Sequence, residues 1–122
     1  MTARRDLGVL GEQLAAGYLR QKGYTILARN YRFGHREIDL IVGRDDVVAF
    51  VEVKARAGAG FGHPLEAITA RKRREVERVA RFWLRRHGRS GLHCRFDAVG
   101  VIVRRDQAPV VEHIPDAWRL GE

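Results

Sequence analysis

Three charged residues in the first half of the chain are of the types, and at the spacing, that phosphodiester hydrolysis requires. Asp39 is followed after twelve residues by Glu52, and Lys54 lies two positions beyond Glu52. Two carboxylates suit a divalent cation, because Mg²⁺ prefers one or two carboxylates and keeps several of its waters. An ammonium group beside them can contact an attacking water or a phosphate. The triplet therefore predicts a metal-dependent hydrolytic site.

The two segments that carry these residues have the pattern of a β-hairpin. Residues 37–42 and 47–54 are rich in Ile, Val and Leu, and the Asp45–Asp46 pair between them favours a turn. Because side chains alternate between the faces of a strand, the glutamate and the lysine of the second segment share a face. The aspartate of the first segment can then lie opposite them across the hairpin.

The same triplet also occurs by chance, and a Glu and a Lys two positions apart often form only an exposed polar set on a strand. Two features favour the chemical interpretation. Residues 47–51 are apolar on both faces, as in a central strand, where a charge at the end is costly unless it is used. Lysine is also scarce, with only Lys22, Lys54 and Lys72 against twenty arginines. A lysine beside paired carboxylates therefore suggests a role that arginine does not fill.

The rest of the chain predicts an α/β fold with a mixed five-stranded sheet flanked by helices. A first helix is expected at residues 6–22, with Asp6 as its N-cap and Gly23 after its end, and a second between Thr69 and Gly88. The remaining strands are expected at residues 24–31, 95–103 and 110–114, and a short helical turn at 115–120. The second helix resembles a crossover, so the third and fourth strands are expected to be parallel.

Glu12, on the first predicted helix, is a fourth acidic candidate. The predicted apolar stripe of this helix consists of Leu7, Leu10, Leu14 and Tyr18. Glu12 falls on the flank of that stripe, beside the small residues Gly8 and Ala15. Small neighbours would let the helix approach the sheet closely, so that the carboxylate reaches over the sheet end. The alternative is a solvated surface glutamate.

Composition predicts a single folded domain over residues 1–122 that lies in the cytoplasm. No apolar run approaches the roughly 20 residues that span a bilayer, and no apolar segment of a secretory signal follows the charged N-terminal residues. The single cysteine, Cys94, cannot form an internal disulfide, which fits a reducing compartment. No membrane partner is expected.

The basic charge of the chain predicts a polyanionic partner. The net charge is +8, and residues 71–89 hold nine Lys or Arg against two Glu. Such a field attracts nucleic acid and makes binding sensitive to salt. The candidate backbone contacts are Arg56, Arg71, Lys72, Arg73 and Arg74. Each of them could equally be a solvated charge, and nothing in the pattern separates DNA from RNA.

Several other ionisable residues have weaker assignments. Glu37 lies on the predicted face of Asp39 and is an alternative ligand, whereas Asp97 is expected to support the structure. The five histidines show no paired metal spacing on a helix face and are expected on the surface or in loops: His35, His63, His87, His93 and His113.

Six short motifs together resemble a known family. They are Gly11–Glu12, Arg29–Arg32, Glu37–Ile41, Phe50–Arg56, Phe61–Pro64 and Arg95–Asp97. In this combination the chain resembles, over nearly its whole length, the YraN family of small bacterial proteins. That family is similar to archaeal Holliday-junction resolvases and to the restriction-endonuclease-like fold of the PD-(D/E)xK nucleases.

The resemblance implies a role for each candidate residue. Asp39 and Glu52, with the backbone carbonyl of Val53, would hold Mg²⁺ or Mn²⁺. Lys54 would orient or activate the attacking water, and Glu12 would occupy the acidic position carried by the helix. No proline precedes Asp39, which departs from the motif that names the nucleases.

The combined expectation is a Mg²⁺-dependent endonuclease that acts on DNA, including branched or flap substrates. One alternative is a nucleic-acid-binding module whose chemistry is weak or lost, and another is a nuclease directed at RNA. The analogy with the resolvases suggests a homodimer.

Overall fold

The computed structural model describes residues 3–58 and 68–120, and the Phe61–Pro64 motif and His63 lie outside these ranges. The described residues form two helices and five strands in sequence. They are α1 (Ala3–Gln21), β1 (Thr25–Phe33), β2 (Arg36–Arg44), β3 (Val47–Ala57), α2 (Ala70–His87), β4 (His93–Val103) and β5 (Val110–Trp118).

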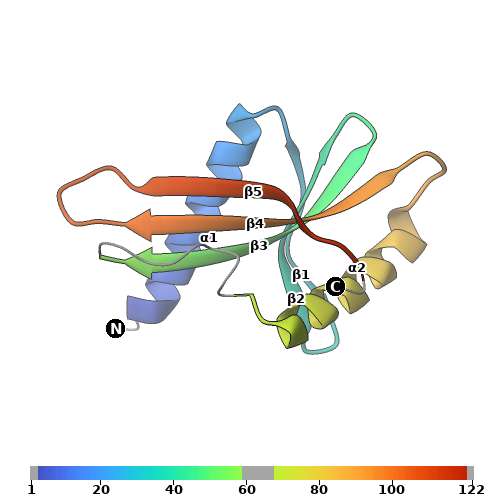
Figure 1. Cartoon of the computed structure of the whole chain (residues 1–122), viewed down its shortest axis with the longest axis horizontal. Helices are drawn as coiled ribbons and strands as arrows, with labels where there is room; N and C mark the ends of the chain where they lie inside the picture. The colour runs from blue at the N-terminus through green and yellow to red at the C-terminus, as the bar shows by residue number, and fades with distance from the viewer. Residues whose placement is uncertain (1–2, 59–67, 121–122) are drawn as a thin grey trace.

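The strands form one mixed sheet in the order β1-β2-β3-β4-β5, with β3 at its centre (Figure 1). Neighbouring strands are antiparallel except β3 and β4, which run parallel from the pair Val47–His93 to the pair Ala57–Val103. The predicted five-stranded α/β fold and the parallel crossover through α2 are therefore confirmed. A parallel pair needs a long connection, and α2 supplies it.

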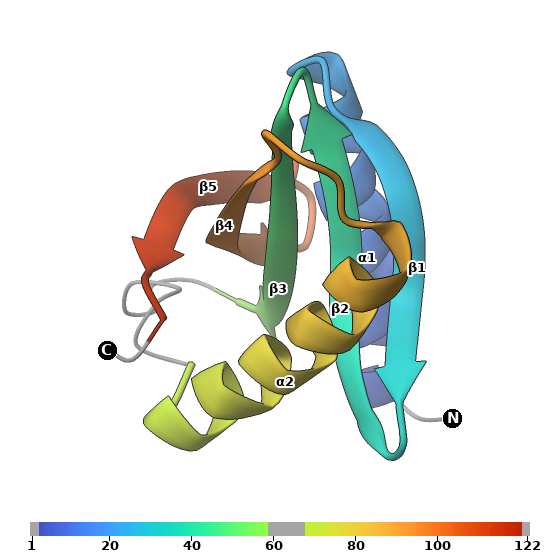
Figure 2. The same cartoon turned by 90° about the vertical axis from the view of Figure 1, so that its right-hand side faces the viewer.

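The two helices cover opposite faces of the sheet, which gives a three-layer arrangement (Figure 2). On one face, Val79 and Trp83 of α2 pack with Phe50 of β3. On the other face, Ala15 and Leu19 of α1 pack with strand residues that include Val51 of β3 and Val99 and Val101 of β4. Within the described ranges, no helix is long and apolar enough to cross a membrane.

The orientation of α1 differs from the prediction. The helix begins at Ala3, so Asp6 lies in its first turn and not at the N-cap. Leu10, placed on the apolar stripe by the sequence, is 39% exposed, whereas Gly11 is buried against β3. A Cβ atom added to Gly11 would lie 2.6 Å from the Cβ of Ala55. The helix therefore turns Gly11 and the buried Ala15 and Ala16 to the sheet, because small side chains allow the closest approach.

The end of β5 also differs from the prediction. Residues 115–120 were expected to form a helical turn, but β5 continues to Trp118, which pairs with Phe96. An irregularity in the register lies between Phe96 and Ala98 of β4. Proline is tolerated on an edge strand or at a bulge, because no ladder hydrogen bond is lost there. Pro115 therefore did not mark the end of the strand.

Both caps of α2 follow the prediction. The side chain of Thr69 accepts a hydrogen bond from the backbone N–H of Lys72, and Gly88 ends the helix. Side-chain caps of this type satisfy N–H groups that have no partner within the helix. The first turn of α2 is thereby held with Lys72 directed to the sheet, at the place where the site forms.

Candidate active site

The candidate site lies where β2 and β3 separate. The last paired residues of this ladder are Leu40 and Val51, so Asp39 and Glu52 are the next opposite positions. Beyond that pair the backbone of β3 bonds to a side chain of β2 and not to its backbone. The N–H of Val53 donates a 2.8 Å hydrogen bond to Oδ2 of Asp39. The prediction that the aspartate faces the glutamate across the hairpin is confirmed.

Both β2 and β1 are irregular beside the acidic groups. Ile38 and Ile41 both pack into the core under α2, although they are three residues apart, whereas Leu40 packs toward α1. Regular alternation would place residues three apart on opposite faces. On the neighbouring strand Asn30 has a φ of 47°, a left-handed conformation that asparagine tolerates better than most residues. The irregularity therefore affects both strands at the level of Asp39.

Asn30 holds two further carboxylates close to the level of Asp39. Its side-chain Nδ2 donates to Oε1 of Glu12 at 3.0 Å and to Oε1 of Glu37 at 3.2 Å. The second oxygen of Glu37 lies 3.3 Å from Nε of Arg32. The structure thus brings Glu12 of α1 beside β1 and β2, as the small residues of the helix suggested. Glu12, Asn30, Glu37, Asp39 and Glu52 are called the carboxylate cluster below.

The sequence reasoning missed Asn30. The available signal was a lone asparagine in a run that otherwise reads as a strand. Asparagine is uncommon within strands and marks left-handed or bulged positions. Such a residue therefore indicates that the backbone is irregular where it occurs.

Burial and mutual repulsion raise the proton affinity of the two central carboxyl groups. Burial is the largest cause that raises the pKa of Asp39 to about 6, the N–H of Val53 opposes it, and the charge of Glu12 adds to it. Burial and then the charge of Asp39 raise the pKa of Glu52 to about 8. Carboxyl groups with shifted pKa values cluster at functional sites, because catalysis requires charged groups at positions where folding does not favour a charge.

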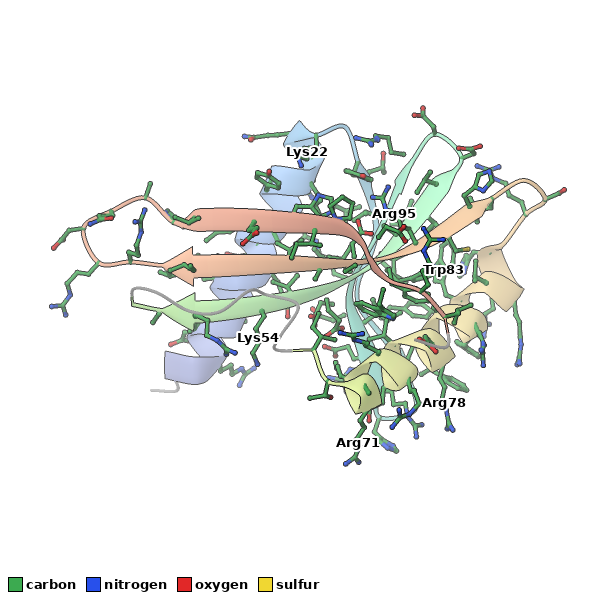
Figure 3. The ribbon with its side chains drawn as sticks, in the orientation of Figure 1. Lys22, Lys54, Arg71, Arg78, Trp83 and Arg95 are labelled. Carbon is green, nitrogen blue, oxygen red and sulfur yellow. The ribbon has the colours of Figure 1, made fainter. Side chains whose placement is uncertain are left out.

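The ammonium group beside Glu52 belongs to Lys72 and not to Lys54. Nζ of Lys72 lies 3.7 Å from Oε2 of Glu52, whose side chain is 9% exposed. From the sequence, Lys72 was expected to bind phosphate. Which side of a helix faces the sheet is determined only when the helix packs against it. Lys54 shares the strand face of Glu52 but extends into solvent from β3 (Figure 3). Glu52 therefore forms its ion pair with Lys72, while Lys54 lies two positions further along the same face of β3.

The residues present fit a divalent cation. Oε1 of Glu52 is buried and has no hydrogen-bond partner among the described residues, which is costly for an acceptor. A cation at this oxygen would satisfy it and offset the repulsion from Asp39. No group of three or more His, Cys, Asp or Glu in residues 3–58 and 68–120 is arranged to hold a metal ion. Mg²⁺ needs only one or two carboxylates, since water completes its shell.

The basic residues of α2 form the second part of the site. The exposed arginines of this helix are Arg71, Arg74, Arg78, Arg81, Arg85 and Arg86. Figure 3 shows Arg71 and Arg78 projecting from α2 away from the sheet. Arg73, by contrast, is half-buried, donates to the carbonyl of Ile68 at 3.3 Å and lies over the ring of Trp118. Arg56 on β3 is also half-buried.

A separate buried network surrounds Asp97 on β4. Asp97 accepts hydrogen bonds from Nε and a terminal nitrogen of Arg95, from the backbone N–H of Asp116 and, at 2.8 Å, contacts Nε2 of His113. Burial raises its pKa, but the bonds from His113 and Arg95 outweigh burial and hold the pKa below its usual range. The expectation that Asp97 is structural fits this network.

The position of His113 is a correction to the sequence analysis. Its side chain is 2% exposed, whereas the sequence placed it on the surface or in a loop. Asp97 and Tyr24 explain the burial, because Asp97 contacts Nε2 of the ring and the Tyr24 ring lies edge-on to it. The other described histidines, His35, His87 and His93, are exposed as expected.

A cavity of about 410 Å³ opens between α2 and the ends of β4 and β5. Its apolar walls include Leu84, Phe96 and Trp118. None of its lining residues belongs to the carboxylate cluster, so the candidate chemistry and this cavity are distinct features of the described structure.

Comparisons with known proteins identify close relatives. A family model described as "Uncharacterised protein family UPF0102" matches residues 11–101, a range that contains the whole carboxylate cluster and α2. A UPF0102 protein of Rhodococcus jostii (strain RHA1) is 44% identical over 112 residues, which cover 92% of this chain and 95% of the relative. A UPF0102 protein of Chlorobium chlorochromatii (strain CaD3) is 48% identical over 118 residues, which cover 93% and 91%.

Proposed function

This chain belongs to the UPF0102 family, and from the geometry of its carboxylate cluster we propose that it is a Mg²⁺- or Mn²⁺-dependent endonuclease that hydrolyses phosphodiester bonds in DNA. One observation carries the proposal. Asp39 and Glu52 face each other at the point where two strands separate, and the pKa of each is raised. Next to them stands the exposed basic side of α2, which suits a phosphate backbone.

The arrangement of elements supports a restriction-endonuclease-like assignment. The order is one helix, three antiparallel strands, a crossover helix and two further strands. The acidic residues lie on the second and third strands, and an additional glutamate comes from the first helix. This placement agrees with the resemblance to the PD-(D/E)xK nucleases. The fold alone does not determine function, so the proposal rests on the site.

In the proposed mechanism the protein positions its acidic groups before any substrate arrives. Asp39 and Glu52, with the carbonyl of Val53, would hold the cation, which when bound polarises a phosphate and acidifies a water. The N–H of Val53 fixes the Asp39 carboxylate at 2.8 Å. Asn30 fixes Glu12 beside the cluster, where its carboxylate can accept a hydrogen bond from a water.

The two lysines have different tasks in this proposal. Lys72 stabilises the charge of Glu52 from α2, as its 3.7 Å separation indicates. Lys54, on the same strand face as Glu52 and open to solvent, would contact the attacking water and the scissile phosphate. Lysine suits that role because its ammonium is compact and carried on a flexible stem.

A cleavage panel tests the proposal directly. Duplex, single-stranded, flap and four-way-junction DNA, with matching RNA, are incubated with wild-type protein in Mg²⁺, in Mn²⁺ or in EDTA. We expect metal-dependent cleavage of DNA, and a loss of about 100-fold or more in Asp39→Asn and in Glu52→Gln, since each removes a charge required in the transition state.

The matched control is Asp106→Asn, the same chemical change in the β4–β5 turn at the far end of the molecule from α2 (Figure 1). Its cleavage rate should equal that of wild type. Cleavage that survives Glu52→Gln would overturn the assignment of the site. Binding without cleavage of any substrate would favour the non-catalytic module, and cleavage of RNA alone would favour the RNA-directed enzyme.

Cation binding has a readout besides activity. A ligand that binds only the folded state raises the melting temperature. Mg²⁺ or Mn²⁺ should therefore stabilise wild type and Asp106→Asn, and should have a much smaller effect on Asp39→Asn. Equal stabilisation of all three proteins would place the cation elsewhere.

A further inference from the structure

A pair of stacked aromatic rings lies at the end of β1 beside α2. The rings of Phe33 and Phe82 have centroids 4.3 Å apart and an interplanar angle of 17°. Tyr31 lies against the same Phe82 ring at 6.4 Å. Phe33 nevertheless remains 39% exposed. Because one face of its ring rests on Phe82, the exposed area belongs to the opposite face and the rim.

An exposed ring face of this type suits one more stacked ring. Aromatic rings prefer parallel, offset partners at short distance, and Phe33 and Phe82 already adopt that arrangement. A nucleobase is a planar ring that can extend the stack by one layer. Stacking of a base on an aromatic side chain strengthens binding on the order of tenfold and does not depend strongly on sequence.

The surroundings of the two rings are basic. The guanidinium of Arg86 lies 5.2 Å from the centroid of Phe82. The side chain of Arg32, next to Phe33 in the chain, is 70% exposed. Arg85 is exposed on the same turn of α2 as Arg86. Positive charge around an exposed aromatic face favours a polyanion with π-faces over an apolar protein surface.

The strands that carry or adjoin Phe33 also lead to the carboxylate cluster. Arg32 forms an ion pair with Glu37, which shares the Asn30 amide with Glu12. Phe33 pairs with Arg36, three residues before Asp39 on β2. At about 3.3 Å per residue, this separation is about 10 Å along the strand. It corresponds to about three nucleotide steps of a B-form strand.

We propose that Phe33 and Phe82 form a stacking platform for an unpaired nucleobase of the nucleic acid whose backbone crosses the carboxylate cluster. This inference rests on the proposed function and narrows its substrate. In the interior of a duplex each base face is covered by its neighbours, so away from a duplex end only an unpaired base can present a face to Phe33. The preferred substrate therefore carries unpaired nucleotides about three steps from the reactive phosphodiester.

Binding of fluorescent DNA tests the platform without any cleavage. A blunt duplex and the same duplex with a three-nucleotide overhang containing 2-aminopurine are titrated in EDTA with wild type, Phe33→Leu and Phe33→Tyr. We expect wild type to prefer the overhang and to quench 2-aminopurine. Phe33→Leu should weaken overhang binding on the order of tenfold, as loss of one stacked base predicts, and should leave the duplex affinity unchanged.

Two comparisons make the test specific. Phe33→Tyr keeps the ring and should retain the overhang preference and the quenching. Leu27→Ala removes another exposed apolar side chain of β1, which is 48% exposed, and should behave as wild type. Equal losses on both DNAs in Phe33→Leu, or a wild-type protein with no overhang preference, would overturn the platform. A change of oligomeric state in Phe33→Leu with unchanged DNA binding would also overturn it and indicate a protein interface.

The platform and the proposed function can fail separately. Quenching and overhang preference that depend on Phe33, in a protein that cleaves nothing with Mg²⁺ or Mn²⁺, would support the platform and reject the nuclease. Metal-dependent cleavage with equal rates for wild type and Phe33→Leu on the overhang substrate would support the nuclease and reject the platform.

Discussion

At the scale of single residues, Glu52 combines a buried carboxyl group with a neighbouring like charge, and its pKa is raised to about 8. The folded protein therefore keeps a proton on Glu52 at pH values where the unfolded chain, with an ordinary pKa of 4.5, has released it. The contribution of Glu52 to the free energy of unfolding is fully present below pH 4.5 and is lost as the pH rises toward 8. Glutamine carries no such charge.

Glu52→Gln should therefore increase the free energy of unfolding at pH 8 in the absence of divalent ions. The expected gain is on the order of a few kcal/mol, because a tenfold difference in proton affinity corresponds to about 1.4 kcal/mol. At pH 5 wild type and variant should be nearly equal. Urea denaturation in EDTA at both pH values measures the difference, with Asp106→Asn as control. A gain that is the same at pH 5 and pH 8 would contradict the pKa assignment.

The lysine on β3 carries the second residue-scale prediction. Lys54→Arg should lower the single-turnover cleavage rate by about 100-fold or more, which is typical for loss of a group that assists proton transfer. Guanidinium is planar, wider and always charged, so it would displace the water or pair with Glu52. Lys22→Arg is the matched control, since Lys22 lies after α1 over the ring of Tyr18. Wild-type rates in Lys54→Arg would exclude lysine chemistry at this position.

The sequence predicted the opposition of Asp39 and Glu52 because the two-residue period of a strand and the Asp45–Asp46 turn determine the register. It could not predict the contact between Lys72 and Glu52. That contact depends on where α2 docks, and nine basic residues in one segment give no sign of which one turns inward. Which residue of a helix reaches the site is therefore determined by how the helix packs on the sheet.

At the scale of elements, α1 approaches β3 through Gly11. A Cβ atom there would lie 2.6 Å from that of Ala55, closer than packed atoms can be. Gly11→Ala should therefore destabilise the protein by about 1–3 kcal/mol, as overpacked cores do. It should also weaken stabilisation by Mg²⁺, because the adjacent Glu12 moves with the helix.

Gly17 provides the control for this change on the same helix. An added Cβ at Gly17 meets no atom within 4 Å. Gly17→Ala should stabilise the protein by about 0.5–1 kcal/mol through the better helix propensity of alanine. Chemical denaturation of the two variants measures both effects. Gly11→Ala as stable as wild type would show that α1 does not need its close contact.

The basic side of α2 carries the second element-scale prediction. Arg71 and Arg74 are exposed at the start of the helix, near Lys72 and the carboxylate cluster. Replacing both with alanine should reduce the slope of log affinity against log salt by about 2, about 1 for each lost phosphate contact. Arg105→Ala, in the distant β4–β5 turn, should leave the slope unchanged. A wild-type affinity that does not vary with salt would show that these arginines are solvated surface charges that do not contact phosphate.

Most of the elements could be predicted from patterning, and the exceptions have physical causes. The apolar runs and the caps at Thr69 and Gly88 located α2 and the strands beside it. The stripe predicted on α1 was right for Leu14, which packs against the core, and wrong for Leu10, because the close contact with β3 is made by Gly11. Pro115 suggested a break, but β5 is an edge strand and accommodates it.

At the scale of the whole molecule, two groups of buried carboxyl residues limit the pH range of stability, one from the acid side and one from the alkaline side. Hydrogen bonds hold the pKa of Asp97 low, so its contribution is present above pH 3.8 and is lost as the pH falls further. Asp39 and Glu52 have raised pKa values, so stability decreases as the pH rises toward about 6 and then about 8. Without divalent ions the maximum should therefore lie near pH 4, and saturating Mg²⁺ should move it to higher pH.

Thermal melting between pH 3 and pH 9, with EDTA or with Mg²⁺, measures this shift. The acid side of the curve should be steep, because protonation adds to a net charge that is already +8. The Asp39→Asn, Glu52→Gln double variant should show a maximum closer to neutral pH in EDTA and no response to Mg²⁺ through this site. A wild-type optimum that is the same in EDTA and in Mg²⁺ would contradict the coupling.

The parallel pair at the centre of the sheet also determines the order in which the chain can complete its fold. Val47 of β3 pairs with His93 of β4 across the whole of α2, so this contact closes a long loop and forms late. Until β4 arrives, β3 presents one open edge of the apolar run Val47–Val51, the type of edge that recruits other strands. We therefore expect fragments that end before β4, including nascent and proteolysed chains, to aggregate where the intact chain does not.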